Sequence, residues 1–139
     1  MSGNDKLSIM LWSASVDKLY PVAMLAAGAA AMDVQVNIFL TFSGVEAFRK
    51  GALQTNTQIT GDYASHGEKF LKLIQEHNVP PWYQTLAQAK EMGDVKISAC
   101  AMTMDLFGLT KDDLDEMVED IEGMASFAEE AKGGQILFV

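Results

Sequence analysis

Residues 95–109, VKISACAMTMDLFGL, decide the fold of this chain. The segment VKISACA at 95–101 is rich in apolar and small residues, which is typical of a strand buried within a parallel sheet. A short helix is expected directly afterwards, over 103–107. A strand that leads straight into a helix is the building unit of α/β folds.

The same alternation continues on both sides of this segment. Ser15 is expected to cap a long helix that runs to about Met32, and Pro21 inside it predicts either a kink or a helix that starts near the proline. Thr110 is expected to cap a further helix over the acidic stretch TKDDLDEMVED. The other expected strands are 7–12, 34–42, 120–122 and 135–139, and the other expected helices are 44–50, 67–77, 82–92 and 124–132.

This order of elements predicts one domain, residues 1–139, with a three-layer α/β/α fold. Its sheet is expected to be mostly parallel and to have about five strands. The polar segment 51–66, GALQTNTQITGDYASH, has no clear periodicity and is longer than most connections in such a fold. It is therefore either a lid or binding loop, or an insertion without a role of its own.

Length and charge narrow the classes of function. The chain has 139 residues, with 10 basic and 19 acidic side chains and a formal net charge of −9. Such a charge disfavours binding to nucleic acids and to anionic membrane surfaces. The longest charge-free apolar stretch, 19–32, is shorter than the roughly 18 apolar residues of a membrane span, and it is expected to be a buried helix. The first residues lack the pattern of a signal peptide, so we expect a cytoplasmic protein.

Cys100 is the strongest nucleophile near the carboxyl ends of the expected strands, where sites form in open parallel sheets. It is the only cysteine, which excludes an intrachain disulfide. The amide groups at the start of the following helix would stabilise a thiolate. The alternative is that Cys100 is a small, buried and inert side chain.

Several other residues are candidates to line a pocket beside this cysteine. Thr103 is expected either to donate a hydrogen bond to the thiolate or to cap the helix. Met102 and Met104 would line a pocket poor in water or an oligomer interface, or belong to the core. The remaining candidates are Ser13, Ser43, Arg49 and Lys50, although the last two are also explained as a solvated helix end.

No cofactor and no metal is expected. The sequence lacks the phosphate-binding patterns G-x-G-x-x-G and G-x-x-x-x-G-K-[ST], and it lacks the nucleophile pattern G-x-S-x-G. His66 and His77 have no cysteine nearby and are expected on the surface. Flavin binding in the crevice of the sheet is a further alternative, by analogy with other doubly wound folds.

Residues 97–109, ISACAMTMDLFGL, resemble the cysteine motif of the DsrE/DsrF-like sulfur-relay family, in particular its peroxiredoxin-like DsrE branch. Residues 39–44, FLTFSG, and the last helix and strand of the chain, 123–139, also resemble this branch. The resemblance implies an α/β/α domain that forms homo-oligomers. It also implies that Cys100 carries sulfane sulfur as a persulfide, which it receives from a donor protein and passes to an acceptor protein.

The chain departs from that pattern in two respects. The second cysteine found in many sequences of the branch is absent, and Ile97 replaces the threonine of the peroxidatic pattern T-x-x-C. A relay needs a single accessible thiol, because the next protein supplies the second one. Two hypotheses follow: a sulfur carrier or sulfurtransferase centred on Cys100, or a scaffold or regulatory subunit that acts through protein contacts alone.

Overall fold

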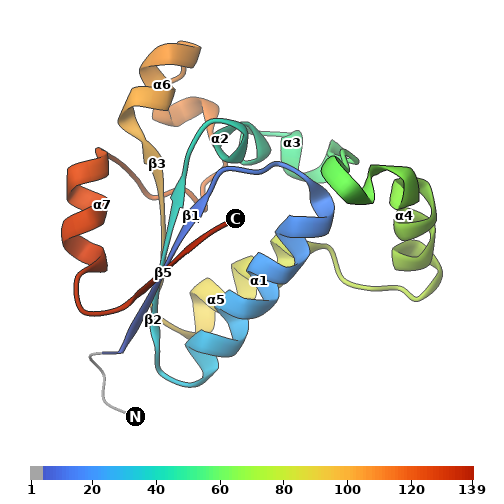
Figure 1. Ribbon diagram of the computed structural model, residues 1–139, viewed down its shortest axis with the longest axis horizontal. Helices are drawn as coiled ribbons and strands as arrows, with labels where there is room; N and C mark the ends of the chain where they lie inside the picture. Colours follow the sequence, from blue (N-terminus) through green and yellow to red (C-terminus); the bar gives the residue numbers. More distant parts are fainter. Residues whose placement is uncertain (1–4) are drawn as a thin grey trace.

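The computed structural model describes residues 5–139, and its centre is a five-stranded sheet in which all strands are parallel (Figure 1). The strand order is β4-β3-β2-β1-β5. Neighbouring strands pair in register, for example Met10 of β1 with Phe39 of β2, and Phe39 with Ser98 of β3. The strands are β1 (Lys6–Leu11), β2 (Gln35–Leu40), β3 (Val95–Cys100), β4 (Asp120–Glu122) and β5 (Gln135–Phe138).

Helices cover the two faces of the sheet unequally (Figure 1). Helices α1 (Val16–Ala31) and α5 (Trp82–Met92) pack against each other on one face, and α7 (Met124–Ala131) lies on the other. The remaining helices are α2 (Ser43–Ala47), α3 (Ala52–Thr55), η1 (Gly61–His66), α4 (Gly67–Glu76), α6 (Ala101–Phe107) and the short 3-10 turn η2 (Lys111–Asp113). Of these, α2, α3 and α6 lie toward the carboxyl edge of the sheet, whereas η1 and α4 lie to the side, beyond the start of α1 (Figure 1). The expected three-layer α/β/α fold is therefore confirmed.

The two faces of the sheet differ because side chains alternate along each strand. On β1, Leu7, Ile9 and Leu11 join the main core with the buried side chains of α1 and α5. The opposite face is mixed. It carries a small apolar cluster beneath α7 and the buried polar side chains Ser8 and Asn37.

The elements before β4 differ from the prediction in their boundaries. Helix α1 begins at Val16, ahead of Pro21, so the alternative of a helix that starts near the proline is wrong. The third strand ends at Cys100, and α6 begins at once with Ala101, earlier than the expected start at Thr103.

The predicted acidic helix after Thr110 is wrong. Only η2 forms there, although Thr110 and Asp113 make the expected capping box. Acidic side chains four residues apart, such as Asp112 and Glu116, would repel each other on a helix. The backbone instead bonds to the segment after α2, where Lys50 N donates to Asp113 O at 3.0 Å and Asp115 N donates to Phe48 O at 2.7 Å.

The segment 51–66 has more structure than predicted, since it contains α3 and η1. Backbone contacts hold it against the start of α1: Val16 N donates to Gln58 O at 2.8 Å, and Thr60 N donates to the Ser15 hydroxyl at 2.9 Å. The side chain of Asn56 also donates to Ala14 O at 2.9 Å. These contacts explain how a polar segment without periodicity is ordered.

Within residues 5–139, no helix is long and apolar enough to cross a membrane.

An ion pair near β3 predicts a pH dependence of stability. Burial raises the pKa of Glu119, but a hydrogen bond from Lys90 (2.6 Å) and one from Ile97 N (3.2 Å) outweigh it and lower the pKa overall. A carboxylate whose pKa is lowered by folding stabilises the protein at pH values above its pKa in the unfolded chain. This contribution is lost as the pH falls through its pKa in the folded protein. We expect Glu119→Gln to reduce the free energy of unfolding at neutral pH by no more than about 1 kcal/mol, because the carboxylate is half exposed.

Urea unfolding of both proteins between neutral and acidic pH tests this expectation. The difference between them should shrink as Glu119 becomes protonated. A difference that stays constant across this range would contradict the assigned cause.

Candidate functional site

Cys100 lies at the junction between β3 and α6, as the last residue of the strand and the N-cap of the helix. Its backbone is extended, with φ −68° and ψ 122°, so the chain turns into α6 directly after it. The residue is only 4% exposed. The cysteine therefore has the predicted position at the carboxyl edge of the sheet, but it is covered in the single chain.

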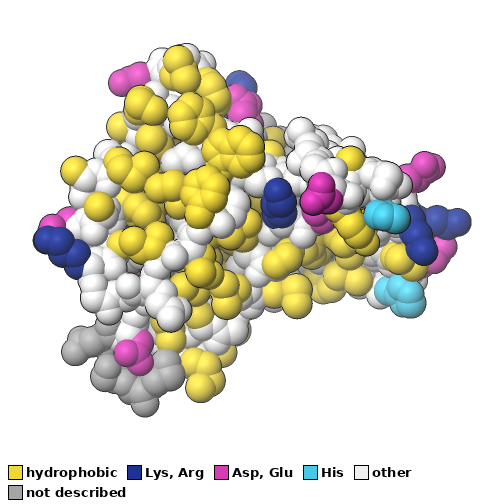
Figure 2. All heavy atoms as spheres, in the orientation of Figure 1, with side chains coloured by type: hydrophobic (Ala, Val, Ile, Leu, Met, Phe, Trp, Pro, Cys, Tyr) yellow, Lys and Arg dark blue, Asp and Glu magenta, His cyan; other side chains and the backbone are white. Residues whose placement is uncertain are grey.

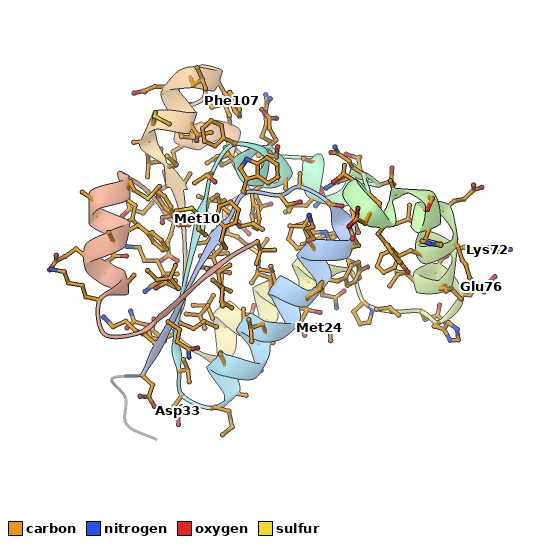
Figure 3. All side chains as sticks on the ribbon, in the orientation of Figure 1. Met10, Met24, Asp33, Lys72, Glu76 and Phe107 are labelled. Atoms are coloured by element: carbon orange, nitrogen blue, oxygen red, sulfur yellow. The ribbon has the colours of Figure 1, made fainter. Side chains whose placement is uncertain are left out.

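The side chains that cover Cys100 are apolar and come from α7, β2 and β1. Cys100 forms a cluster with Phe39 of β2 and Phe127 of α7, against which Met10 of β1 packs. The rings of Phe39 and Phe127 stack with 4.7 Å between centroids and 10° between planes. Figure 3 shows Met10 on the side of the sheet that faces α7. Access to the sulfur thus depends on α7 and its neighbours.

A charged cluster lies on the same face of the sheet. Glu122 of β4 is the register partner of Cys100 on β3, and it is 8% exposed. Lys96 Nζ lies 2.8 Å from Glu130 Oε1, 3.4 Å from Glu122 Oε2 and 3.9 Å from Asp120 Oδ2. The hydrogen bond to Glu130 raises the pKa of Lys96, opposed by burial and supported by the charge of Glu122. Lys96 therefore stays charged at neutral pH.

The three candidates on α6 have different surroundings. Thr103 is fully buried, and its hydroxyl accepts a hydrogen bond from Phe42 N at 3.2 Å. This bond links α6 to the turn after β2, where Phe42 has a left-handed φ of 48°. Met104 is buried in the main core, whereas Met102 is exposed. Met102 and Met104 thus face different environments and do not form one pocket lining.

The four remaining candidates lie in the segments that follow β1 and β2. Ser13 is buried, and its hydroxyl accepts a hydrogen bond from Ser15 N at 3.0 Å. Ser43 is the first residue of α2. Arg49 is exposed and pairs with Glu46 at 3.3 Å, while Lys50 lines a shallow surface pocket formed by the acidic segment 111–119. The structure provides a local partner or another surface for three of these side chains.

An exposed apolar surface lies around this region. Figure 2 shows hydrophobic side chains gathered over the face that carries α6, α7 and β5, with charged groups mainly at the rim. We call this surface the apolar face. It contains exposed large side chains of these elements, namely Met102, Leu106, Phe107, Met124, Ile136 and Phe138.

In the described part of the chain, no group of three or more His, Cys, Asp or Glu side chains is placed to hold a metal ion. His66 and His77 are both exposed. The charged groups nearest the cysteine along the sheet were missed from the sequence. Because side chains alternate along a strand, Lys96, Ser98 and Cys100 of β3 are expected on one face of the sheet. Only the pairing of β3 with β4 shows that Glu122 lies beside Cys100.

Comparison with known families tests the resemblance of the cysteine segment. The profile described as "DsrE/DsrF/DrsH-like family" matches residues 3–67 and 62–139 of this chain. The chain belongs to this family. Its predicted membership is therefore confirmed over nearly the whole length.

Two proteins that are similar to this chain in sequence support its membership of the family. The "Uncharacterized protein YrkE" of Bacillus subtilis is 34% identical over an alignment 158 positions long, which covers 96% of this DsrE-like chain and 96% of the relative. The "Sulfur carrier protein DsrE2" of Allochromatium vinosum is 27% identical over an alignment 148 positions long, which covers 89% of this chain and 91% of the relative.

Solved structures show the same fold at low sequence identity. The protein MTH1491 of Methanobacterium thermoautotrophicum matches with a TM-score of 0.60 and 15% identity, over 98% of this chain and 100% of its own. The ychN protein of E. coli matches with a TM-score of 0.58 and 16% identity, over 97% and 99%. These likenesses support the architecture of the DsrE-like chain.

Proposed function

We propose that this DsrE-like protein carries sulfane sulfur as a persulfide on Cys100 and passes it to a partner protein. The observation that carries the proposal is the position of Cys100, at the end of β3 and at the start of α6. The family and the relative named as a sulfur carrier support the same chemistry.

The proposed transfer requires one thiol and no cofactor. The Cys100 thiolate attacks the outer sulfur of a donor persulfide, and a new S–S bond forms on Cys100 as the S–S bond of the donor breaks. The donor sulfur leaves with the bonding electron pair and takes up the proton that the Cys100 thiol has lost. Attack by an acceptor thiolate on the outer sulfur of the Cys100 persulfide empties the carrier by the same exchange.

The burial of Cys100 fits a carrier whose sulfur is reached when α7 moves outward, a movement that contact with a partner would favour. Phe127 and Met10 shield the sulfur, which protects a persulfide from oxidation while it is carried. Transfer then requires an outward movement of α7 or of its first turn. A cytoplasmic location, where thiols are kept reduced, suits such a lone cysteine.

The apolar face supplies the surface on which partners would dock. Its side chains come from α6, which follows Cys100 directly, from α7, which carries Phe127, and from β5, and they carry no charge that would repel another protein. Donor and acceptor proteins, and further copies of this chain in a homo-oligomer, are the proposed occupants. Exposed apolar side chains in this number are unusual on an isolated chain.

Mass spectrometry of the intact protein tests the proposal. After incubation with polysulfide, we expect the mass to rise by one sulfur atom on most chains, and the gain to disappear on addition of dithiothreitol. Cys100→Ser should show no gain, because it retains the shape of the residue and loses the nucleophile. Equal gains in both proteins, or no gain with polysulfide and thiosulfate, would overturn the proposal.

The burial of Cys100 also favours a second candidate function, that of a scaffold or regulatory subunit. In this case the cysteine packs inertly between β3 and α7, and the apolar face alone binds partners. The absence of any sulfur gain, together with stable binding to another protein that Cys100→Ser preserves, would support this function.

A further inference from the structure

The two edges of the sheet are unequally protected against pairing with another chain. At one edge, β4 has three residues, and two of them are the acidic residues Asp120 and Glu122. Short length and charge are common means by which proteins block an edge strand. At the other edge, β5 has the sequence QILF, without charge or proline, and all four of its residues are exposed. The edge at β5 therefore lacks the protection that β4 has.

The backbone of β5 presents hydrogen-bonding groups along this outer edge. Val139, which continues the strand, directs both of its backbone groups at β1: its N–H donates to Met10 O at 2.9 Å, and its C=O accepts from Trp12 N at 2.7 Å. The backbone groups of successive residues in a strand point to opposite sides. Those of Ile136 and Phe138 therefore point away from β1, where they offer a template for a further strand.

Apolar side chains lie on both faces of the sheet beside this edge. Ile136 and Phe138 are on the face that carries α7, as is Met10, the register partner of Phe138. Leu137 is on the face that carries α1, as is its partner Ile9. On that face a shallow groove with a volume of about 160 Å³ lies between α1 and the end of β5, lined also by Asp17, Lys18, Pro21, Val22, Leu25 and Val139. A strand added to β5 would thus meet apolar surface on both sides.

We propose that a second copy of this chain pairs with β5 through its own β5. The two strands run antiparallel about a two-fold axis at Leu137, and the two sheets become one continuous sheet. Ile136 then lies opposite Phe138 of the second copy, and each outward backbone group of these residues gains a hydrogen-bond partner. Main-chain hydrogen bonds supply most of the affinity in such strand addition.

The distribution of charge favours a second copy at this edge. A formal net charge of −9 opposes self-association, so two copies meet most readily where neither carries charge. The strand β5 is such a place, and the charged residues of the adjoining groove, Asp17 and Lys18, have opposite signs. Self-pairing through β4 would instead bring carboxylates together.

The pairing would organise the apolar face for binding partners. A two-fold axis perpendicular to a sheet keeps its faces on the same side, so α7 of both copies would cover the same face of the joined sheet. The apolar faces of the two copies would then meet at the seam. The inference goes beyond the proposed sulfur transfer, since a scaffold with this fold would form the same pair.

Disulfide cross-linking tests the proposed register. Opposite residues of a non-hydrogen-bonded antiparallel pair have Cα atoms about 4.5 Å apart, which is within the range for a disulfide. We expect Leu137→Cys, in a chain that also carries Cys100→Ser, to form a covalent dimer under mild oxidation for most of the protein. Met92→Cys in the same background is the control, because Met92 is exposed at the end of α5. Cross-linking of Leu137→Cys no faster than that of Met92→Cys would overturn the inference.

Sedimentation velocity tests the role of the backbone. The unmodified protein should have at least twice the mass of one chain, and Ile136→Pro should halve that mass. Proline removes the outward N–H of Ile136 and leaves the bonds of β5 to β1 in place. Ile136→Ala retains this N–H and should keep the mass of the unmodified protein.

A single-chain mass of the unmodified protein, or an unchanged mass of folded Ile136→Pro, would also overturn the pairing. If Ile136→Pro fails to fold, the cross-linking decides. Neither experiment uses a sulfur donor, and the cross-linked chain lacks Cys100. Paired chains without sulfur uptake would remove the relay and leave the pairing, and sulfur uptake by single chains would do the reverse.

Discussion

The substitution Gly44→Ala should lower the free energy of unfolding by about 3 kcal/mol. A Cβ atom at Gly44 would lie 2.1 Å from the carbonyl oxygen of Leu11, which belongs to β1. The obstacle is backbone and not a flexible side chain, so the end of β1 or the start of α2 must shift. Gly44 N also donates to Trp12 O at 2.9 Å, a hydrogen bond that this shift would strain.

Gly28→Ala is the control for this substitution. A Cβ atom at Gly28 meets nothing within 4 Å, and the residue lies inside α1, so alanine should stabilise the protein by about 0.5–1 kcal/mol. Urea denaturation of the three proteins measures both effects. Similar stabilities of Gly44→Ala and the unmodified protein would mean that β1 and α2 do not approach as closely as described.

Phe127→Ala should both destabilise the protein and expose the cysteine. Phe127 is 2% exposed and stacks on Phe39, so its truncation should cost about 3–4 kcal/mol. The same change removes the ring that covers Cys100. We therefore expect a maleimide reagent to label Cys100 at least about tenfold faster, since opening of the native structure limits the reaction of a buried group.

Phe138→Ala provides the comparison for Phe127→Ala. It also removes a phenyl ring, but from β5, where Phe138 is 68% exposed. We expect the free energy of unfolding to change by no more than about 0.5 kcal/mol and the labelling rate of Cys100 to stay the same. Labelling is followed under conditions in which all variants are folded, as judged by circular dichroism. Equal labelling rates in Phe127→Ala and the unmodified protein would show that another element controls access.

The fold could be predicted from the sequence because its signals are local. Apolar runs such as LSIMLW at 7–12 and VKISACA at 95–101 specify buried strands, and amphipathic segments between them specify helices. The helix expected after Thr110 was wrong because its capping signal is also local, whereas the backbone of Asp113 and Asp115 bonds to the distant residues Lys50 and Phe48. A tertiary contact there overrides the local preference.

The candidate site was predicted only in part. Cys100 could be placed at the end of a strand from its own segment. The pocket lining from Ser13, Ser43, Arg49 and Lys50 stays a prediction, and the structure gives Ser13, Arg49 and Lys50 other partners or another surface. Glu122 and Phe127 could not be assigned to the site, because nothing in the sequence states which strand pairs with β3 or which helix covers it.

The sequence by itself determined the parallel α/β architecture, the single cysteine and the place of that cysteine at a strand-to-helix junction. These properties depend on the periodicity of residues near one another in the chain. Only the tertiary structure decided that Cys100 lies beneath Phe127 and beside Glu122, and that Met102 faces outward while Met104 is buried. Burial and electric field at one atom depend on residues brought together from distant segments, and strand order and helix packing fix those neighbours.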